Sequence, residues 1–215
     1  MSVLTERLGA CYTSAVHDVM VAQGMDDFVL PRTIRPLLPG RRLAGPVWTV
    51  SGRRHENIAP HDTYLSWTKL LGSVPGGHVL VCQPNDDALA HMGELSAETL
   101  QSRGTLGYIV DGGCRDVGFI QQRSFPVYCR YATPTDIVGR WLPERAGDPI
   151  AIGDVAIACG DWVLADDDGI VVLPADRAEA IVTATETVMA AENQVRDAIR
   201  AGMDPQVAYL KHRKF

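Results

Sequence analysis

The chain has 215 residues, of which 46% are hydrophobic and 21% charged, and its formal net charge at pH 7 is −6. These proportions are those of a globular protein with a full hydrophobic core. The negative charge argues against a nucleic-acid-binding surface, which needs clustered Lys and Arg. No apolar run reaches transmembrane length. We therefore expect neither nucleic acid nor a membrane among the partners.

The numbers and positions of cysteine and lysine residues limit the cellular compartment and the catalytic mechanisms that we expect. The five cysteines show no C-x-x-C spacing, and most lie beside apolar residues, as buried free thiols do. With no signal peptide, we expect the reducing environment of the cytoplasm. Lysine occurs only at Lys69, Lys211 and Lys214, so Lys69 is the sole interior candidate for a Schiff base. If the chain cleaves carbon–carbon bonds, a metal ion is the expected electron sink.

Apolar periodicity and turn residues predict alternating helices and strands. In chain order we expect one or two helices in 3–23, strands at 33–36 and 46–51, a helix at 63–71, a strand at 78–83, a helix at 95–103, a strand at 108–110, a helix at 117–123, a strand at 126–131, an irregular excursion over 133–148, strands at 155–158 and 162–165, and a final helix over 176–201. Thr13 or Ser14 is the expected first N-cap, and Asp176 with Glu179 forms a capping box. Gly104 lies where a C-cap glycine belongs.

Three groups of polar residues have a catalytic or metal-binding interpretation that we do not favour. They are His17 with Asp18, the set His55, Glu56, His61 and Asp62, and the run Asp166-Asp167-Asp168-Gly169. The first pair is adjacent on a helix, which favours a solvent or interface position. The second set lacks ligand spacing on one helix, so we predict a helix cap at 62 or 63. The third lacks the ligand pattern of a calcium loop, so we predict a turn joining two strands.

The stretch from Gly93 to Asp116 is the most informative one. A buried strand at 108–110 leads through an Asp-Gly-Gly turn to Arg115 and Asp116, and a predicted helix has Glu94 in its first turn. Taken singly, an Arg–Asp pair after a turn is usually a surface salt bridge. Taken together, the helix amides, the guanidinium and the carboxylate favour an anion site with room for a divalent metal.

Three segments carry a resemblance to the RraA-like family: GELSAETLQSRGTLGYIVDGGCRD (93–116) followed by FPVY, GDWVLADDDGIVVLP (160–174), and LPRTIRPLLPGRRLAGPVWTV (30–50). The resemblance covers most of residues 13–202 in the same order. This family holds 4-hydroxy-4-methyl-2-oxoglutarate and 4-carboxy-4-hydroxy-2-oxoadipate aldolases, and regulators that bind ribonuclease E. It implies one α/β domain over residues 1–215 with three β/β/α layers (swivelling-domain-like), assembled as trimers or hexamers with sites between subunits. Heptad spacing predicts that the long helix within 176–202 packs on a neighbouring subunit.

By this resemblance the chain is expected to be an Mg²⁺- or Mn²⁺-dependent aldolase that cleaves a 4-hydroxy-2-oxo acid and releases pyruvate. The same chemistry would permit oxaloacetate decarboxylation. Asp116 is the expected metal ligand, and Arg115 is expected to hold the C2 oxygen and the carboxylate. Glu94 is expected to position the proton-carrying water, with Glu192 of a neighbouring subunit as the second acid. The substrate carboxylate is expected at the amides of Gly93, Glu94, Leu95 and Ser96.

Two other functions remain open at this point. The chain could be a binding regulator of a ribonuclease, although regulators of this family tend to lose the acid after the arginine, and Asp116 is present here. It could also act on another 2-oxo acid or a sugar acid. The run Arg53-Arg54-His55 and the residue Cys114 leave room for such a different substrate.

Overall fold

Two buried strands near the middle of the chain, β3 (Val79–Gln83) and β4 (Gly107–Val110), define the layers of the fold. Successive side chains of a strand point to opposite faces of the sheet. Leu80 accordingly packs in one hydrophobic core, whereas Val79 and Val81 pack in another. The computed structural model, which describes residues 2–213, therefore has apolar cores on both faces of its main sheet.

The main sheet has the strand order β1-β6-β4-β3-β2-β11-β12, and β8 pairs with a further part of β2. Strands β2, β3, β4 and β6 run parallel, while β11 and β12 continue the sheet in antiparallel fashion. The bounds of these strands are β1 (Arg35–Pro36), β2 (Leu43–Arg54), β6 (Val127–Cys129), β8 (Trp141–Ala146), β11 (Trp162–Ala165) and β12 (Ile170–Leu173). Two small sheets are formed by β5 (Gly113–Cys114) with β7 (Tyr131–Ala132), and by β9 (Ile150–Ile152) with β10 (Val155–Ile157).

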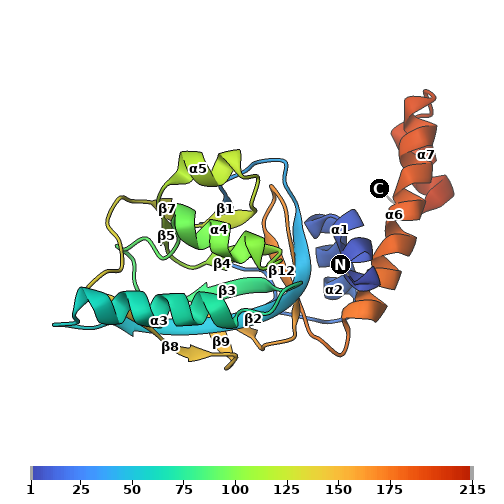
Figure 1. Ribbon diagram of the computed structural model, residues 1–215. Helices are drawn as coiled ribbons and strands as arrows, with labels where there is room; N and C mark the ends of the chain where they lie inside the picture. Colours follow the sequence, from blue (N-terminus) through green and yellow to red (C-terminus); the bar gives the residue numbers. More distant parts are fainter. Residues whose placement is uncertain (1, 214–215) are drawn as a thin grey trace.

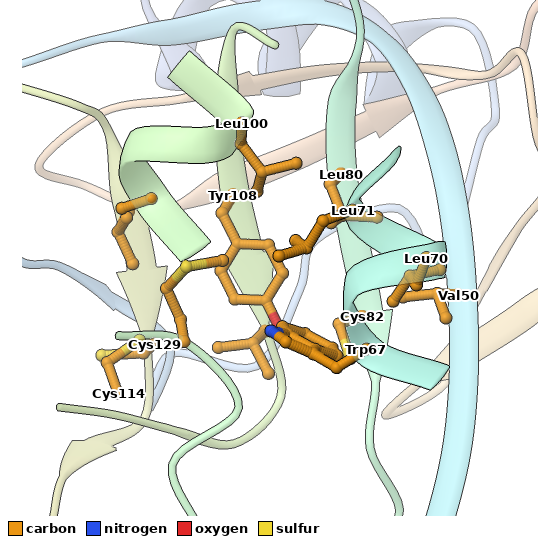
Figure 2. Close-up of a cluster of buried hydrophobic side chains, with 14 of the residues drawn as sticks. Val50, Trp67, Leu70, Leu71, Leu80, Cys82, Leu100, Tyr108, Cys114 and Cys129 are labelled. Atoms are coloured by element: carbon orange, nitrogen blue, oxygen red, sulfur yellow. The ribbon is translucent and has the colours of Figure 1, made fainter. Parts of the chain in front are cut away.

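Three helices cover one face of the sheet: α3 (Pro60–Ser73), α4 (Glu94–Ser102) and α5 (Val117–Gln122) (Figure 1). Their apolar stripes meet the strands in the first core, where Figure 2 shows Tyr108 and Leu80 of the strands beside Leu71 and Trp67 of α3. Hydrophobic residues of the β9–β10 hairpin cover part of the opposite face. The result is a mixed α/β fold of three layers, β/β/α, as the family resemblance implies.

A third core attaches the peripheral helices α1 (Val3–Ala10), α2 (Thr13–Ala22) and α6 (Ala178–Arg200) to strands β11 and β12. Ile181 and Val182 near the start of α6 are fully buried there. Beyond this core α6 extends away from the sheet and is followed by α7 (Pro205–His212) (Figure 1). No helix within residues 2–213 is both long and apolar enough to cross a membrane.

Several predicted caps are wrong. The N-cap of α2 is Tyr12, and the carboxylate of Asp166 accepts hydrogen bonds from the amide (2.9 Å) and the hydroxyl (2.6 Å) of Thr13. Helix α3 begins at Pro60 rather than at 62 or 63, because the fixed φ of proline suits the first helical position. Helix α6 begins at Ala178 after Arg177, with no side-chain cap, so Asp176 forms no capping box.

The predicted excursion over 133–148 contains a strand, β8, which pairs with the outer half of β2. The region 126–131 is divided between β6 and β7, and β5, β9 and α7 were not predicted. The charged residues and the proline of β8 are unusual in a strand, so the local sequence does not predict one. The strand forms because it pairs with β2, about 90 residues earlier in the chain. The other predicted elements are present, with ends shifted by at most three residues.

The other polar groups considered in the sequence lie at the surface or in structural contacts, and Glu56, His61 and Asp62 are exposed. His17 and Asp18 are exposed, and the carboxylate of Glu144 is shared by His55 Nε2 at 3.0 Å and Arg53 Nε at 2.8 Å. The Asp-rich run forms the β11–β12 turn, as predicted. Four of the five cysteines are buried free thiols, whereas Cys159 is exposed.

Candidate active site

The site lies where three loop segments meet beyond the carboxyl ends of parallel strands β3 and β4. Ligands of open α/β sheets commonly bind at such strand ends. Ala90, in the loop after β3, forms parallel bridges with both Gly113 and Asp136. The amide of Arg115 donates to the carbonyl of Met92 at 2.8 Å. These backbone contacts bring residues far apart in the sequence to one place.

Asp116 and the start of α4 are in direct contact. The Oδ2 atom of Asp116 accepts a hydrogen bond from the Glu94 amide at 3.0 Å, and Arg115 Nε lies 3.5 Å from the same oxygen. Asp116 has a left-handed backbone conformation, with φ of 55°. A Cβ atom on Gly93 would lie 2.7 Å from Asp116 Oδ2 and 3.1 Å from Arg115 Nε. Glycine at 93 therefore permits the close approach of the ion pair to the helix start.

The amides at the start of α4 provide an anion-binding position. The first amides of a helix have no partner inside the helix and carry partial positive charge. The Glu94 amide is used by Asp116, but the amides of Leu95 and Ser96 donate to no atom within residues 2–213. Those two amides remain available to a carboxylate or phosphate.

Arg115 lies between two carboxylates. Its Nη1 atom is 3.2 Å from Asp136 Oδ2, and Asp136 is in turn held by Arg140 at 3.4 Å and by the amide of Val138 at 3.2 Å. The Arg115 side chain remains 41% exposed, so its guanidinium can still donate to a ligand. Asp136 was not singled out in the sequence, since it lies in the apparent excursion and no motif spacing links it to Arg115.

These residues line a cavity of about 400 Å³ between α3 and α4. All the residues predicted to bind substrate or metal, from Gly93 to Ser96 together with Arg115 and Asp116, lie on its wall. Trp67 of α3 donates from Nε1 to the hydroxyl of Ser96 at 2.8 Å, which fixes the two helices to each other. The remaining wall is largely apolar.

A buried histidine lies behind this cavity wall. The side chain of His91 is 0% exposed, and neither ring nitrogen has a hydrogen-bond partner within residues 2–213. Its ring packs edge-on against Trp141 with centroids 5.0 Å apart, and Nε2 lies 3.8 Å from Asp86 Oδ1. Burial lowers the pKa of His91 to about 4, although Asp86 opposes the shift, so the imidazole is neutral at pH 7.

Glu192 lies elsewhere in the same chain. It is on α6, where it lines a different cavity with Arg196 and accepts a hydrogen bond from the hydroxyl of Tyr12. Figure 1 shows α6 at the opposite end of the molecule from α3 and α4. One chain therefore does not bring Glu192 to Arg115 and Asp116, and its assignment to the site of a neighbouring subunit stays a prediction.

The donor set fits a hard cation that is held mostly by water and substrate. Within residues 2–213 no group of three or more His, Cys, Asp or Glu side chains could form a protein cage for a metal. Asp116 offers one carboxylate on the cavity wall, and Mg²⁺ is commonly bound through one or two carboxylates and several waters. Lys69 is exposed on α3 and lacks the apolar pocket that a Schiff-base lysine needs.

Comparisons with known proteins agree with this fold. The family model described as RraA-like, Aldolase/RraA, matches residues 13–172. Protein DlpA of Legionella pneumophila is 28% identical over 205 residues, which cover 94% of this chain but 32% of that protein, so this chain spans about a third of its length.

Two further relatives point to the two kinds of protein in the family. A protein of Halalkalibacterium halodurans named "Putative 4-hydroxy-4-methyl-2-oxoglutarate aldolase" is 26% identical, covering 85% of this chain and 83% of that protein. The solved structure of Streptomyces coelicolor RraAS2, described as an unusual member of the RNase ES inhibitor RraA protein family, has a TM-score of 0.80 and 26% identity. That match covers 91% of this chain and 96% of RraAS2.

Proposed function

Because this chain belongs to the RraA-like family, we propose that it is a divalent-metal-dependent aldolase that cleaves a 4-hydroxy-2-oxo acid and releases pyruvate. Relatives named as 4-hydroxy-4-methyl-2-oxoglutarate aldolases support carbon–carbon lyase chemistry. The observation that carries the proposal is the meeting of two free helix amides, the Arg115 guanidinium and the Asp116 carboxylate on the wall of one cavity.

Substrate binding follows from the positions of these groups. The C1 carboxylate of the 2-oxo acid binds to the amides of Leu95 and Ser96, where the partial positive charge of α4 is concentrated. Arg115 donates from its planar fork to the C2 oxygen. Asp136 acts as a positioning residue, because its ion pair with Arg115 limits the orientations of the guanidinium.

Cleavage of the C3–C4 bond sends an electron pair toward the C2 oxygen. Arg115 stabilises the negative charge that develops there, and such a preorganised donor acts more strongly in the transition state than in the bound substrate. A divalent cation held by Asp116 and water, Mg²⁺ or Mn²⁺, supplies Lewis-acid stabilisation of the same charge when bound. Oxaloacetate decarboxylation makes the same demand, so we expect it as a side activity.

Proton movement requires an acid–base group near C3 and C4. Glu94 is half-buried on the cavity wall, and its carboxylate orients a water that takes the proton of the C4 hydroxyl. The same water returns a proton to C3 as pyruvate forms. We assign the second acid to Glu192 of a neighbouring subunit in a homotrimer or homohexamer, which is the assembly proposed for the active protein.

A regulator of a ribonuclease is the second candidate, and the likeness to RraAS2 favours it. In that case binding would use a surface rather than the cavity, and Asp116→Ala would leave inhibition of ribonuclease E unchanged. Under the aldolase proposal, purified protein does not inhibit ribonuclease E, and Asp116→Ala abolishes pyruvate release.

The decisive experiment measures pyruvate release from 4-hydroxy-2-oxo acids with and without EDTA. We expect EDTA to abolish activity and Mg²⁺ or Mn²⁺ to restore it. Treatment with borohydride in the presence of pyruvate is the control for covalent chemistry. Trapping of pyruvate on Lys69, or full activity in EDTA, would refute the metal-dependent mechanism.

A further inference from the structure

The cavity wall away from Arg115 and Asp116 is apolar. Its inner part is formed by buried side chains of Trp67, Leu71, Met92 and Ile137, which are at most 8% exposed. The more exposed Tyr64 stands at the mouth on the α3 side. A volume of about 400 Å³ is within the range that encloses small organic ligands.

Four of the hydroxyl groups on this wall already have partners in the protein. The Thr68 and Thr99 hydroxyls donate to the carbonyls of Tyr64 at 2.6 Å and Leu95 at 2.7 Å. The Thr63 hydroxyl accepts from the amide of Gly139 at 3.0 Å, just as Ser96 accepts from Trp67. The Thr63 and Ser96 hydroxyls, which accept here, and the Tyr64 hydroxyl at the mouth are neutral groups, so none of them could balance the charge of a second carboxylate.

The charges on the wall are unfavourable for a second carboxylate. Arg115 is the only cationic side chain among the lining residues, against the three carboxylates of Glu94, Asp116 and Asp136. His91 supplies no further cation, since burial keeps it neutral. A carboxylate placed against the apolar wall would lose hydration without gaining a charged partner among the described residues of the same chain, which is costly.

Building on the aldolase function proposed above, we infer that the substrate is a 4-hydroxy-2-oxo acid with a single carboxylate and an apolar alkyl or aryl group at C4. The carboxylate and C2 oxygen occupy Arg115 and the amides of Leu95 and Ser96. The apolar group lies against Trp67, Leu71 and Ile137. The dicarboxylate 4-hydroxy-4-methyl-2-oxoglutarate is then a poorer substrate.

The reaction balances without an oxidant or a second substrate. The C4 hydroxyl loses its proton and C4 becomes the carbonyl carbon of an aldehyde or ketone. The C3–C4 bond breaks, its electron pair passes to the 2-oxo fragment, and C3 gains one proton. For 4-hydroxy-2-oxo-4-phenylbutanoate the products are pyruvate and benzaldehyde.

Ligand preference can be measured without turnover. We expect calorimetry in the presence of Mg²⁺ to show 2-oxo-4-phenylbutanoate binding at least about tenfold tighter than 2-oxoadipate. Both compounds share the 2-oxo acid and lack the C4 hydroxyl, so neither is cleaved. Comparable affinities, or tighter binding of 2-oxoadipate, would overturn the inference.

Two matched variants on α3 test whether the cavity sets this preference. Tyr64 and Leu65 are 57% and 55% exposed, but only Tyr64 lines the cavity. Tyr64→Arg adds a cation at the mouth and is expected to shift the affinity ratio about tenfold toward 2-oxoadipate. Leu65→Arg adds the same charge outside the cavity and is expected to leave the ratio unchanged. Equal shifts in both variants, or no shift in Tyr64→Arg, would overturn the assignment.

Pyruvate release separates this inference from the function on which it rests. The wild-type protein is expected to cleave 4-hydroxy-2-oxo-4-phenylbutanoate with a higher kcat/KM than 4-hydroxy-4-methyl-2-oxoglutarate. Preference for the dicarboxylate would overturn this inference but would still support the proposed aldolase function. Release of pyruvate from neither compound would overturn both.

Discussion

Polar contacts between distant segments hold the cavity wall between α3 and α4, whereas apolar packing attaches α1, α2 and α6 to the other end of the sheet. At the cavity, Asp116 contacts the Glu94 amide and Arg115 contacts Asp136, and these groups are partly exposed. In the peripheral layer, fully buried aliphatic side chains form the contact, and one polar link, Asp166 to Thr13, is buried with them. Substitutions in the first region should therefore change catalysis more than stability, and those in the second the reverse.

Among the variants that test this contrast, Asp116→Ala has the largest expected effect. Removal of the carboxylate eliminates the only metal ligand proposed for one chain, so we expect pyruvate release to fall by more than roughly 10³-fold. The melting temperature should fall only modestly: the side chain is 37% exposed, but alanine is less favourable than aspartate in the left-handed conformation at this position. Metal titration by calorimetry checks the cause, and retention of wild-type metal affinity and turnover would refute the site.

Arg115→Lys keeps the charge and removes the planar fork. We expect the variant to fold and to bind metal as the wild type does, while kcat falls on the order of 10²–10³-fold. The wild-type metal titration is the reference measurement. A variant that loses metal affinity in parallel with activity would mean that Arg115 and Asp116 do not have separate roles.

His91 makes the cavity region sensitive to acid. Its pKa lies at about 4 in the folded protein, below the ordinary value near 6.5, so the unfolded chain binds the proton first as pH falls. Above pH 6.5 the neutral His91 therefore contributes on the order of 3 kcal/mol to the free energy of unfolding. This contribution is lost as the pH falls from about 6.5 to 4.

Urea unfolding at several pH values measures this loss. His91→Gln should reduce the slope of stability against pH in that window, and substitution of the exposed His61 by Gln should not. An unchanged slope in His91→Gln would contradict the assignment.

Gly93→Ala tests the close approach at the helix start. The new Cβ would lie 2.7 Å from Asp116 Oδ2, so the carboxylate and Arg115 must move. A displacement of this kind typically costs up to about 10²-fold in activity. Gly118→Ala on α5 is the matched control, since its Cβ would meet no atom within 4 Å. Equal activity in the two variants would show that the contact has no catalytic consequence.

Asp166→Ala probes the peripheral layer, with the smallest expected effect. Loss of the hydrogen bonds to Thr13 should lower the free energy of unfolding by about 1–2 kcal/mol and leave kcat unchanged. Asp168→Ala, an exposed position in the same turn, should change stability by less than about 0.5 kcal/mol. Thermal unfolding and a pyruvate assay on both variants check the prediction.

Local signals account for what the sequence predicts well. Strands β3 and β4 are short apolar runs, and α4 ends before Gly104, whose φ of 80° matches a C-cap glycine. The candidate site was also accessible to sequence reasoning because Gly93 to Asp116 is one continuous segment.

Long-range contacts account for what was missed. Asp136 approaches Arg115 only because the chain between β7 and β8 folds back over the strand ends. No spacing of residues in the sequence predicts this contact. Asp166 was assigned to a turn, correctly, but its bond to Thr13 joins residues 153 positions apart. The role proposed for Glu192 requires a second copy of the chain, because α6 lies away from α3 and α4 in the same chain.

The bond between Asp166 and Thr13 also bears on how the chain folds during synthesis. At about 5–20 residues per second, a ribosome needs roughly 8 to 30 s to make the 153 residues that separate the two partners. During that interval the apolar faces of α1 and α2 have emerged without β11, β12 or α6 to cover them. The apolar faces of α1 and α2 are thus buried only after β11, β12 and α6 have been made, so they stay exposed to solvent on the nascent chain during that interval.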